Sequence, residues 1–318
     1  MKDNVHNTLL NAIKDKVLPG TNVANLLTDI LFIGKEAAYR RLRGEVPFTL
    51  EDVAIISKAI GISIDSVIGQ NDAAQMPFQL ILVKHVNPSL VDYTHMDQAV
   101  KMLHNSRNQS RELGLSANML PQHLFLKHHH LTKFFLLRCL YQWEGLDNVE
   151  SLKDITITQR QADIYQRYRE EFSYISYSYY IWDHFIFLYL VNDIKCFSRI
   201  NFISQEDVAA LKEELLILVD EMELLASKSI NESGSKTEFY LSAVNFENTY
   251  AYLQLENSKF SFIKAFTLNS TVSQDKDVCD RLKKWIESLK RLSTLISESG
   301  EIQRVQFFKE QRELINTI

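Results

Sequence analysis

A short run of basic and polar side chains, YRRLRG at residues 39–44, has the clearest chemistry in this sequence. From Ile33 to Gly44 the chain carries a net charge of +3, whereas residues 1–70 carry equal numbers of basic and acidic side chains. Positive charge concentrated on one segment is typical of contact with phosphates and base edges. A solvated helix face can have the same composition, so the interpretation depends on the neighbouring elements.

Residues that usually carry catalysis or bind metal show no comparable pattern. The phosphate-loop, dinucleotide, zinc-protease and nucleophile-elbow motifs are missing from the sequence. Three consecutive histidines, His128, His129 and His130, would point about 100° apart on a helix and cannot converge on one ion. The three cysteines, far apart in the chain, predict buried thiols: Cys139, Cys196 and Cys279. We therefore expect no enzyme, no cofactor and no metal.

The element before the basic segment is predicted to be a helix that begins at Thr21. Thr21 is a good N-cap residue and follows a Pro19-Gly20 break. The apolar residues of this helix recur every three to four positions, which indicates one buried face: Val23, Leu26, Leu27, Ile30 and Leu31. Ile33-Gly34 then interrupts the pattern, and glycine supplies the backbone freedom that a sharp turn needs.

The basic segment itself is predicted to be a second helix, residues 35–43, ended by Gly44. Ala38 and Leu42 lie one turn apart and would seat this helix on the preceding one. The remaining side chains would point outward and form a long, mostly cationic face: Lys35, Glu36, Tyr39, Arg40 and Arg43.

Further helices are predicted on both sides of this pair. Residues 5–17 have helical apolar spacing, and a Thr49-x-x-Asp52 capping pattern opens a helix over residues 50–60 that Gly61 ends. One more short helix would follow Ser63. The five helices together would form a small domain.

This arrangement resembles the five-helix domain of Cro/repressor-like (Xre-type) helix-turn-helix DNA-binding proteins. The resemblance covers about residues 5–69 and is strongest in PFTLEDVAIISKAIGISIDSVIG. It implies that helix 35–43 is the recognition helix, with its N-terminal residues at base edges in the major groove. Arg41 departs from the pattern because many members have an apolar residue there. YRRLRGE-PFT also resembles longer regulators with a large, uncharacterised C-terminal region.

The resemblance implies a role for each outward residue. Lys35, Glu36, Tyr39 and Arg40 would reach base edges, whereas Arg43, Thr21 and Asn22 would hold phosphates. One such domain offers few contacts, so we expect a homodimer that reads two half-sites about 34–36 Å apart.

Length and composition predict more than one domain. A chain of 318 residues with 46% hydrophobic content can form a small N-terminal domain at residues 1–69, a linker at 70–78 and a larger domain at 79–318. The net charge of −5 makes any DNA contact local to the basic helix. The N-terminus does not look like a signal peptide, and no apolar run reaches about eighteen residues, so we expect a cytoplasmic protein without membrane contact.

The larger domain is predicted to be mainly helical. Helices are expected at residues 92–113, 121–143, 274–298 and 302–318, while residues 78–90 favour neither strand nor helix. Ser204-x-x-Asp207 would cap a helix with a heptad seam, which packs inside the chain or joins two subunits. A shorter seam runs from Leu282 to Ile296. Alternating residues at 238–268 predict three antiparallel strands covered by the 274–298 helix.

The aromatic stretch from Phe172 to Phe202 has two interpretations. It is typical of a core, but it could also form the wall of a pocket for a small-molecule or peptide effector, with Asp183 or His184 as its polar group. The sequence as a whole favours a sequence-specific, DNA-binding transcriptional regulator that dimerises through its C-terminal domain. The main alternative is a protein-interaction or scaffold module whose helix-turn-helix-like domain docks a protein.

Overall fold

The computed structural model describes residues 2–17, 21–62, 64, 67, 78–81, 94–143, 149–265 and 269–318. The chain divides into two compact units, Met1–Phe78 and Gln79–Ile318, called unit 1 and unit 2 below. The linker expected at residues 70–78 lies outside the described residues except for Phe78.

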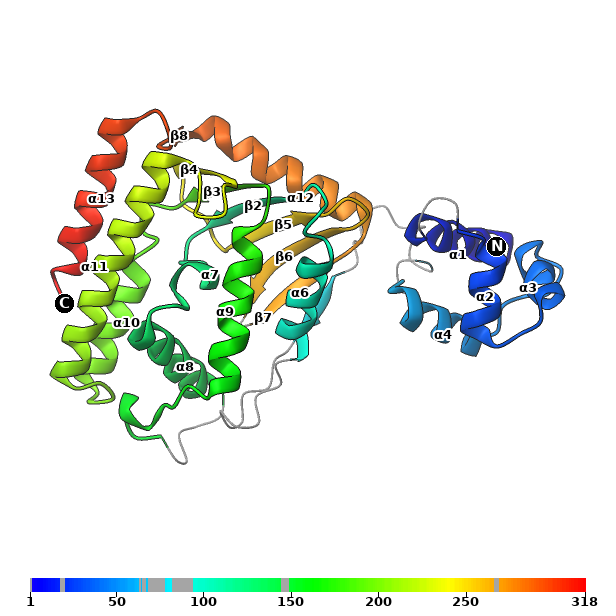
Figure 1. Cartoon of the computed structure of the whole chain (residues 1–318), viewed down its shortest axis with the longest axis horizontal. Helices are drawn as coiled ribbons and strands as arrows, with labels where there is room; N and C mark the ends of the chain where they lie inside the picture. The colour runs from blue at the N-terminus through cyan, green and yellow to red at the C-terminus, as the bar shows by residue number, and fades with distance from the viewer. Residues whose placement is uncertain are drawn as a thin grey trace. The chain divides into compact units, whose positions relative to one another are not determined.

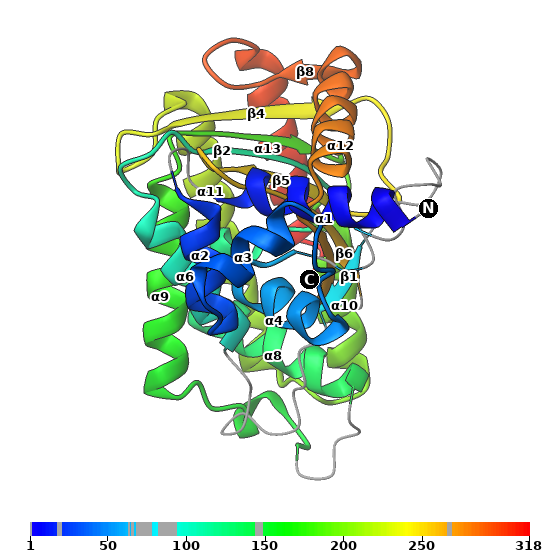
Figure 2. The ribbon, with the colours of Figure 1, turned by 90° about the vertical axis from the view of Figure 1, so that its right-hand side faces the viewer.

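Unit 1 contains four described helices: α1 (Lys2–Lys16), α2 (Val23–Leu31), α3 (Lys35–Leu42) and α4 (Leu50–Ile60). Their apolar faces meet in one core, in which Ile13, Leu27, Ala38 and Ile56 are fully buried. Figure 2 shows α2 and α3 next to each other. The fifth expected helix lies outside the described residues apart from Ile64 and Val67, of which Val67 joins the core.

Unit 2 is built on one eight-stranded mixed sheet, in the order β1-β7-β6-β5-β2-β3-β4-β8 (Figure 1). Strands β2, β3 and β4 are parallel to one another and all other pairs are antiparallel. The strands are β1 (Gln79–Ile81), β2 (Glu112–Ala117), β3 (Tyr177–Trp182), β4 (Lys236–Ser242), β5 (Tyr250–Gln254), β6 (Lys259–Ala265), β7 (Asn269–Ser273) and β8 (Ser293–Leu295).

The described helices of unit 2 connect and cover these strands. They are α6 (Thr94–Asn105), α7 (Gln122–Phe125), α8 (His129–Trp143), α9 (Gln159–Ser173), α10 (Leu188–Arg199), α11 (Gln205–Lys228), α12 (Lys276–Leu289) and α13 (Glu301–Ile315). Helices α7 to α9 lie in the chain between the parallel strands β2 and β3, and α10 and α11 lie between β3 and β4. Parallel strands require such crossovers, which makes this part an α/β arrangement.

The expectation of a mainly helical unit with a small sheet of three antiparallel strands is therefore wrong. The three expected strands exist as β4, β5 and β6, but only β5 and β6 pair with each other. Strands β2 and β3 lie between β5 and β4. β3, with the sequence YSYYIW, is largely buried, so it lacks the polar alternation that marks a strand with one wet face. The expected helix at 92–113 ends at Asn105 and is followed by β2.

Successive side chains of the central strands point to opposite faces of the sheet. On β3, Tyr180 and Trp182 join the large core formed with α8, α10, α11 and α13, whereas Tyr179 and Ile181 pack with Ile286 and Leu289 of α12. Figure 1 shows α12 along the strands. The sheet is thus covered by helices on both faces.

The seam of α11 packs inside its own chain. Leu211, Leu215, Leu218 and Met222 are buried in the core of unit 2, where α11 contacts α13 and α8. The capping box predicted at Ser204 and Asp207 is confirmed. In the shorter seam Leu289 and Ile296 are buried, while Trp285 and Leu292 are about half exposed.

Of the three cysteines, Cys196 is exposed, so the prediction of three buried thiols is wrong for it. Among the described helices, none is long and apolar enough to cross a bilayer.

Gly114 on β2 is required by the packing of two tyrosines on the α12 face. A Cβ at this position would overlap the Tyr252 ring and come within 2.6 Å of the Tyr179 ring. Both rings are fully buried and cannot move aside. We expect Gly114→Ala to lower the free energy of unfolding of unit 2 by about 1–3 kcal/mol.

Tryptophan fluorescence during urea unfolding measures this effect, because Trp143, Trp182 and Trp285 all lie in unit 2. Gly34→Ala is the control, since no atom lies within 4 Å of a Cβ built there. A Gly114→Ala variant with the wild-type urea midpoint would contradict the packing argument.

Candidate nucleic-acid interface

The α2–α3 pair has the connectivity of a helix-turn-helix. Asn22, not Thr21, is the N-cap of α2: its side-chain oxygen accepts hydrogen bonds from the backbone N–H groups of Ala24 (2.9 Å) and Asn25 (3.2 Å). The prediction that Thr21 caps the helix is therefore wrong. The turn depends on Phe32, which adopts the left-handed conformation at φ 53°, whereas Gly34 is extended and serves as the N-cap of α3.

Helix α3 is seated on unit 1 by its apolar side, as predicted. Ala38 is fully buried and Leu42 packs against the same core. Gly44 adopts φ +76° just after the helix, a conformation that favours glycine and lets the chain turn away. The opposite side of α3 is open to solvent, and its exposed residues include all five outward residues predicted from the sequence: Lys35, Glu36, Tyr39, Arg40 and Arg43.

Arg41 is turned inward and anchors α3 to α4. Its Nε donates to Asp52 Oδ2 at 3.1 Å, and both side chains are largely buried. Burial opposes the charge of Asp52, but hydrogen bonds from the Thr49 backbone and from Arg41 hold its pKa below the usual value. Asp52 also completes the predicted capping box with Thr49 at the start of α4. Arg41 thus links α3 to α4 through an ion pair.

We expect Arg41→Ala to destabilise unit 1 by about 1–3 kcal/mol, because it leaves the Asp52 carboxylate partly buried without its cation. Hydrogen exchange followed by mass spectrometry should show faster exchange in peptides from α3 and α4 and no change in unit 2. Arg40→Ala, on the exposed side of the same helix, is the control. Equal exchange in both variants would show that the ion pair does not hold α3.

The two outward arginines are engaged with neighbouring carboxylates. Arg43 Nε donates to Glu45 Oε1 at 2.6 Å, and its Nη2 contacts Glu36 Oε1 at 3.2 Å. Arg40 Nε lies 3.6 Å from Glu45 Oε2. The hydrogen bond with Glu45 raises the pKa of Arg43 and lowers that of Glu45. Exposed ion pairs of this kind exchange easily with solvent and with other partners.

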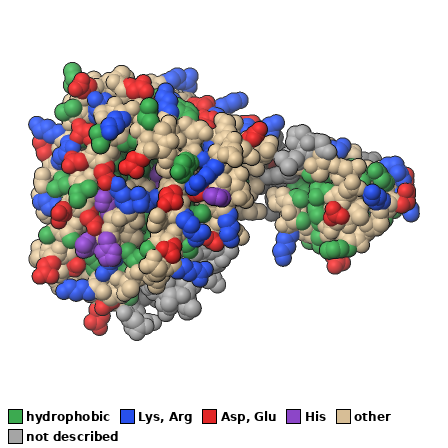
Figure 3. All heavy atoms as spheres, in the orientation of Figure 1, with side chains coloured by type: hydrophobic (Ala, Val, Ile, Leu, Met, Phe, Trp, Pro, Cys, Tyr) green, Lys and Arg blue, Asp and Glu red, His purple; other side chains and the backbone are tan. Residues whose placement is uncertain are grey.

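Glu45 is a residue that the sequence reasoning missed. It follows the Arg43-Gly44 end of the helix, and it is the turn after Gly44 that brings its carboxylate next to both arginines. At the α3 end of unit 1, basic and acidic side chains lie side by side (Figure 3). The cationic face is therefore partly neutralised by Glu36 and Glu45.

The expected phosphate contacts lie at the start of α2. Thr21 and Asn22 are both exposed. The Asn22 side-chain oxygen is used by the cap, which leaves its amide N–H groups as the donors for an anion. The N-terminus of a helix favours negative charge through its dipole and its free N–H groups.

The histidines and the aromatic stretch singled out from the sequence lie in unit 2, where most of them contact other side chains or the backbone of the same unit. His128 and His130 contact the carboxylates of Glu221 and Glu214 on α11. Trp182 is fully buried and packs on Phe239. Asp183 accepts from two backbone N–H groups, and His184 is exposed. Within the described ranges, no three His, Cys, Asp or Glu side chains are placed to hold a metal ion.

Part of the chain matches a known family model. Residues 5–122 match the family model of the BetR domain, a helix-turn-helix-like domain. The match extends beyond unit 1 and ends at the first residue of α7, so it covers less than half of the chain. No curated protein and no solved structure matches the chain.

Proposed function

We propose that this protein is a sequence-specific DNA-binding transcriptional regulator of the Xre type, in which α3 enters the major groove of duplex DNA. The observation that carries the proposal is the division of α3 into two sides. Ala38, Leu42 and the inward Arg41 fix the helix to unit 1, while Lys35, Tyr39, Arg40 and Arg43 remain on the outer side. The match of residues 5–122 to a helix-turn-helix-like domain supports the same function at a coarser level.

The proposed readout divides the outer residues into two groups. Lys35, Glu36, Tyr39 and Arg40 contact base edges, with Arg40 suited to the two acceptors of guanine. Arg43 contacts a phosphate, as do Thr21 and Asn22 at the start of α2. Binding requires Arg40 and Arg43 to exchange Glu45 for DNA, which is feasible because these ion pairs are exposed.

We further propose that unit 2 makes the protein a homodimer. One helix-turn-helix unit buries little surface on DNA, and two units provide the contacts of a specific complex. The α11 seam is buried within its own chain and is not a candidate for the dimer contact. Light scattering with size-exclusion chromatography measures the oligomeric state, and a monomer at all concentrations would contradict this part of the proposal.

The function is tested by a salt titration on duplexes selected from a random pool and on unselected duplexes. A groove reader releases counterions from the phosphates, so its affinity should fall by about 10²-fold or more between about 50 and 200 mM salt. The selected duplexes should bind more tightly than the unselected ones at every salt concentration. Binding to no duplex at low salt would rule out the proposed function.

A second function, docking of a protein by unit 1, is favoured by one observation. Phe32, at the turn between α2 and α3, is 94% exposed, and an exposed aromatic ring is a common anchor in protein interfaces. Partner binding that ignores salt and is lost in Phe32→Ala would favour this alternative. Under the DNA-binding proposal, Phe32→Ala keeps the salt dependence of duplex binding.

A further inference from the structure

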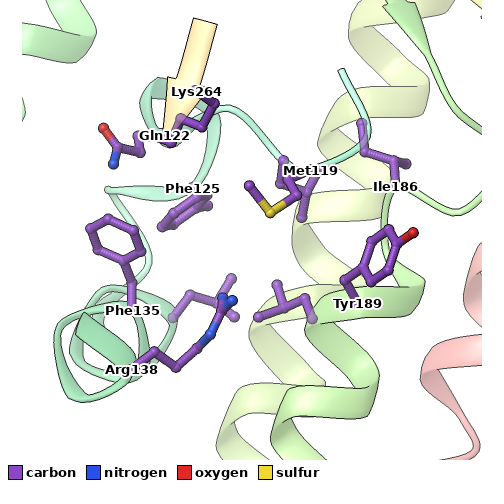
Figure 4. Close-up of a pocket in the computed structure, with 11 residues that line it drawn as sticks. Met119, Gln122, Phe125, Phe135, Arg138, Ile186, Tyr189 and Lys264 are labelled. Atoms are coloured by element: carbon purple, nitrogen blue, oxygen red, sulfur yellow. The ribbon is translucent and has the colours of Figure 1, made fainter. Parts of the chain in front are cut away.

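Unit 2 contains a pocket at the edge of the sheet where several strands end. It is lined by residues from the segments that follow β2 and β3, from α7, α8 and α10, and from the end of β6. Its empty volume is about 580 Å³, counting the open mouth. The close-up in Figure 4 shows Lys264 at the tip of a strand at one end of the pocket and Arg138 entering from the other end.

Strand directions explain why these segments meet. β2 and β3 are parallel, β5 is antiparallel to β2, and β6 is antiparallel to β5, so β6 runs in the same direction as β2 and β3. The carboxyl ends of all three strands therefore lie at one edge of the sheet. In α/β sheets, ligands bind in the crevice outside the carboxyl ends of the strands. The parallel part of this sheet begins at β2, directly beside the pocket.

The walls of the pocket are mainly apolar. They are formed by side chains that surround a narrow space suited to an alkyl chain or a single ring: Met119, Phe125, Leu131, Phe135, Ile186 and Leu190. The polar lining side chains are few, namely Gln122 and the two cations, while the Tyr189 hydroxyl points away from the cavity (Figure 4). Mainly apolar walls with a few placed polar groups are typical of small-molecule sites.

The two cations of the pocket are not equivalent. Arg138 is neutralised by Asp193 of α10, with its Nη2 2.6 Å from the carboxylate. Among the residues that the structure describes, no carboxylate pairs with the Lys264 ammonium, and the ionisable neighbour that acts on it is the Cys139 thiol. Burial lowers the pKa of Lys264 to about 8 and raises that of Cys139 to about 12, so near neutral pH Lys264 is charged and Cys139 is not.

A charged group without a counter-charge in an apolar pocket is costly, and a ligand that brings an anion removes this cost. We propose that this pocket binds a small organic acid, with its carboxylate on the Lys264 ammonium and its apolar body between α8 and α10. Arg138, already paired, forms the polar boundary at the far end. The effector expected from the aromatic stretch would then sit beside Tyr189 rather than around Trp182.

Isothermal titration calorimetry on the full chain without DNA tests the site with three probes of equal length: hexanoate, hexan-1-ol and hexylamine at pH 7. A charge-assisted contact should make hexanoate bind about 10- to 100-fold more tightly than the alcohol. Hexylamine should bind more weakly than either, because two cations would be brought together. An alcohol that binds as tightly as the acid would overturn the proposal.

Two variants locate the site. Lys264→Met should reduce the affinity for hexanoate at least about tenfold while the alcohol still binds, and Leu190→Trp should block both probes by filling the pocket. Lys284→Met, at an exposed position on α12, is the matched control and should bind like the wild type. Undiminished hexanoate binding by Lys264→Met would also overturn the proposal. A regulatory role for the acid rests on the proposed function. These titrations contain no DNA, so their outcome does not depend on whether the protein binds DNA.

Discussion

The double variant Arg40→Ala/Arg43→Ala is expected to lose at least about 100-fold of the affinity of the wild type for a selected duplex. Arg40 alone should account for about 1–3 kcal/mol, at one base position in each half-site, because a bidentate contact to guanine distinguishes it from other bases. Arg43 alone should weaken all duplexes alike and reduce the salt slope by about 1, as expected for one lost phosphate contact. Fluorescence anisotropy with selected and unselected duplexes measures both effects.

Removing the acidic partner of these arginines should have the opposite effect on DNA binding. Glu45 neutralises both arginines and would face the phosphates, so Glu45→Ala should strengthen binding to any duplex, by about 3- to 10-fold at low salt. Lys58→Ala, at an exposed site on α4, is the control for loss of one charge elsewhere in unit 1. Equal losses for Lys58→Ala and the two arginine variants would mean that net charge, rather than α3, attracts DNA.

The second large effect concerns stability. We expect Lys264→Met to raise the free energy of unfolding of unit 2 at pH 7 by up to about 3 kcal/mol, since a pKa lowered to about 8 reflects the cost of burying the charge. Urea unfolding followed by tryptophan fluorescence measures the change in unit 2. Because partial hydration of the ammonium reduces this cost, the figure is an upper bound.

The stability difference between Lys264→Met and the wild type should depend on pH. The unfolded chain keeps the Lys264 proton up to about pH 10.4, whereas the folded chain releases it near pH 8. Between these values the unfolded state binds more protons, so the stability of the wild type should rise with pH relative to that of Lys264→Met. The advantage of the variant should be full below pH 8 and disappear near pH 10.4. Lys284→Met, which removes an exposed lysine, should show no such window.

A pH-independent difference between Lys264→Met and the wild type would contradict the interpretation. It would mean that the added apolar side chain, and not the removed charge, stabilises unit 2. Saturating hexanoate should reduce the advantage of the variant, because the ligand stabilises only the protein that binds it.

Local patterns in the sequence determined much of unit 1. Apolar spacing of three and four residues, the Thr49–Asp52 capping box and Gly44 after α3 depend on residues within one or two helical turns of each other, and all three were confirmed. The outward side of α3 followed from the same spacing. The helix-turn-helix could be predicted because its geometry is set by local interactions.

Details that depend on a second element could not be predicted even there. Thr21 and Asn22 are both residue types that cap helices, and the position at which the backbone becomes helical makes Asn22 the N-cap. Arg41 was grouped with the basic segment, but its partner Asp52 lies on another helix and turns it inward. Glu45 is near Arg40 and Arg43 only because the chain turns after Gly44.

The fold of unit 2 depends mainly on strand pairing between segments that are distant in the sequence. Whether YSYYIW lies in a core helix or in a central parallel strand depends on β2 and β4, which are paired with it from distant parts of the chain. The apolar and aromatic residues of this segment indicated that it is buried, but they did not indicate which strands pair with it. The pocket has the same origin: Lys264 lines the same space as Phe125 and Tyr189 only because three strands end at one edge of the sheet. The sequence by itself thus determined the local helices and their exposed charges, whereas strand order, and with it the surroundings of each buried ion, followed only from tertiary structure.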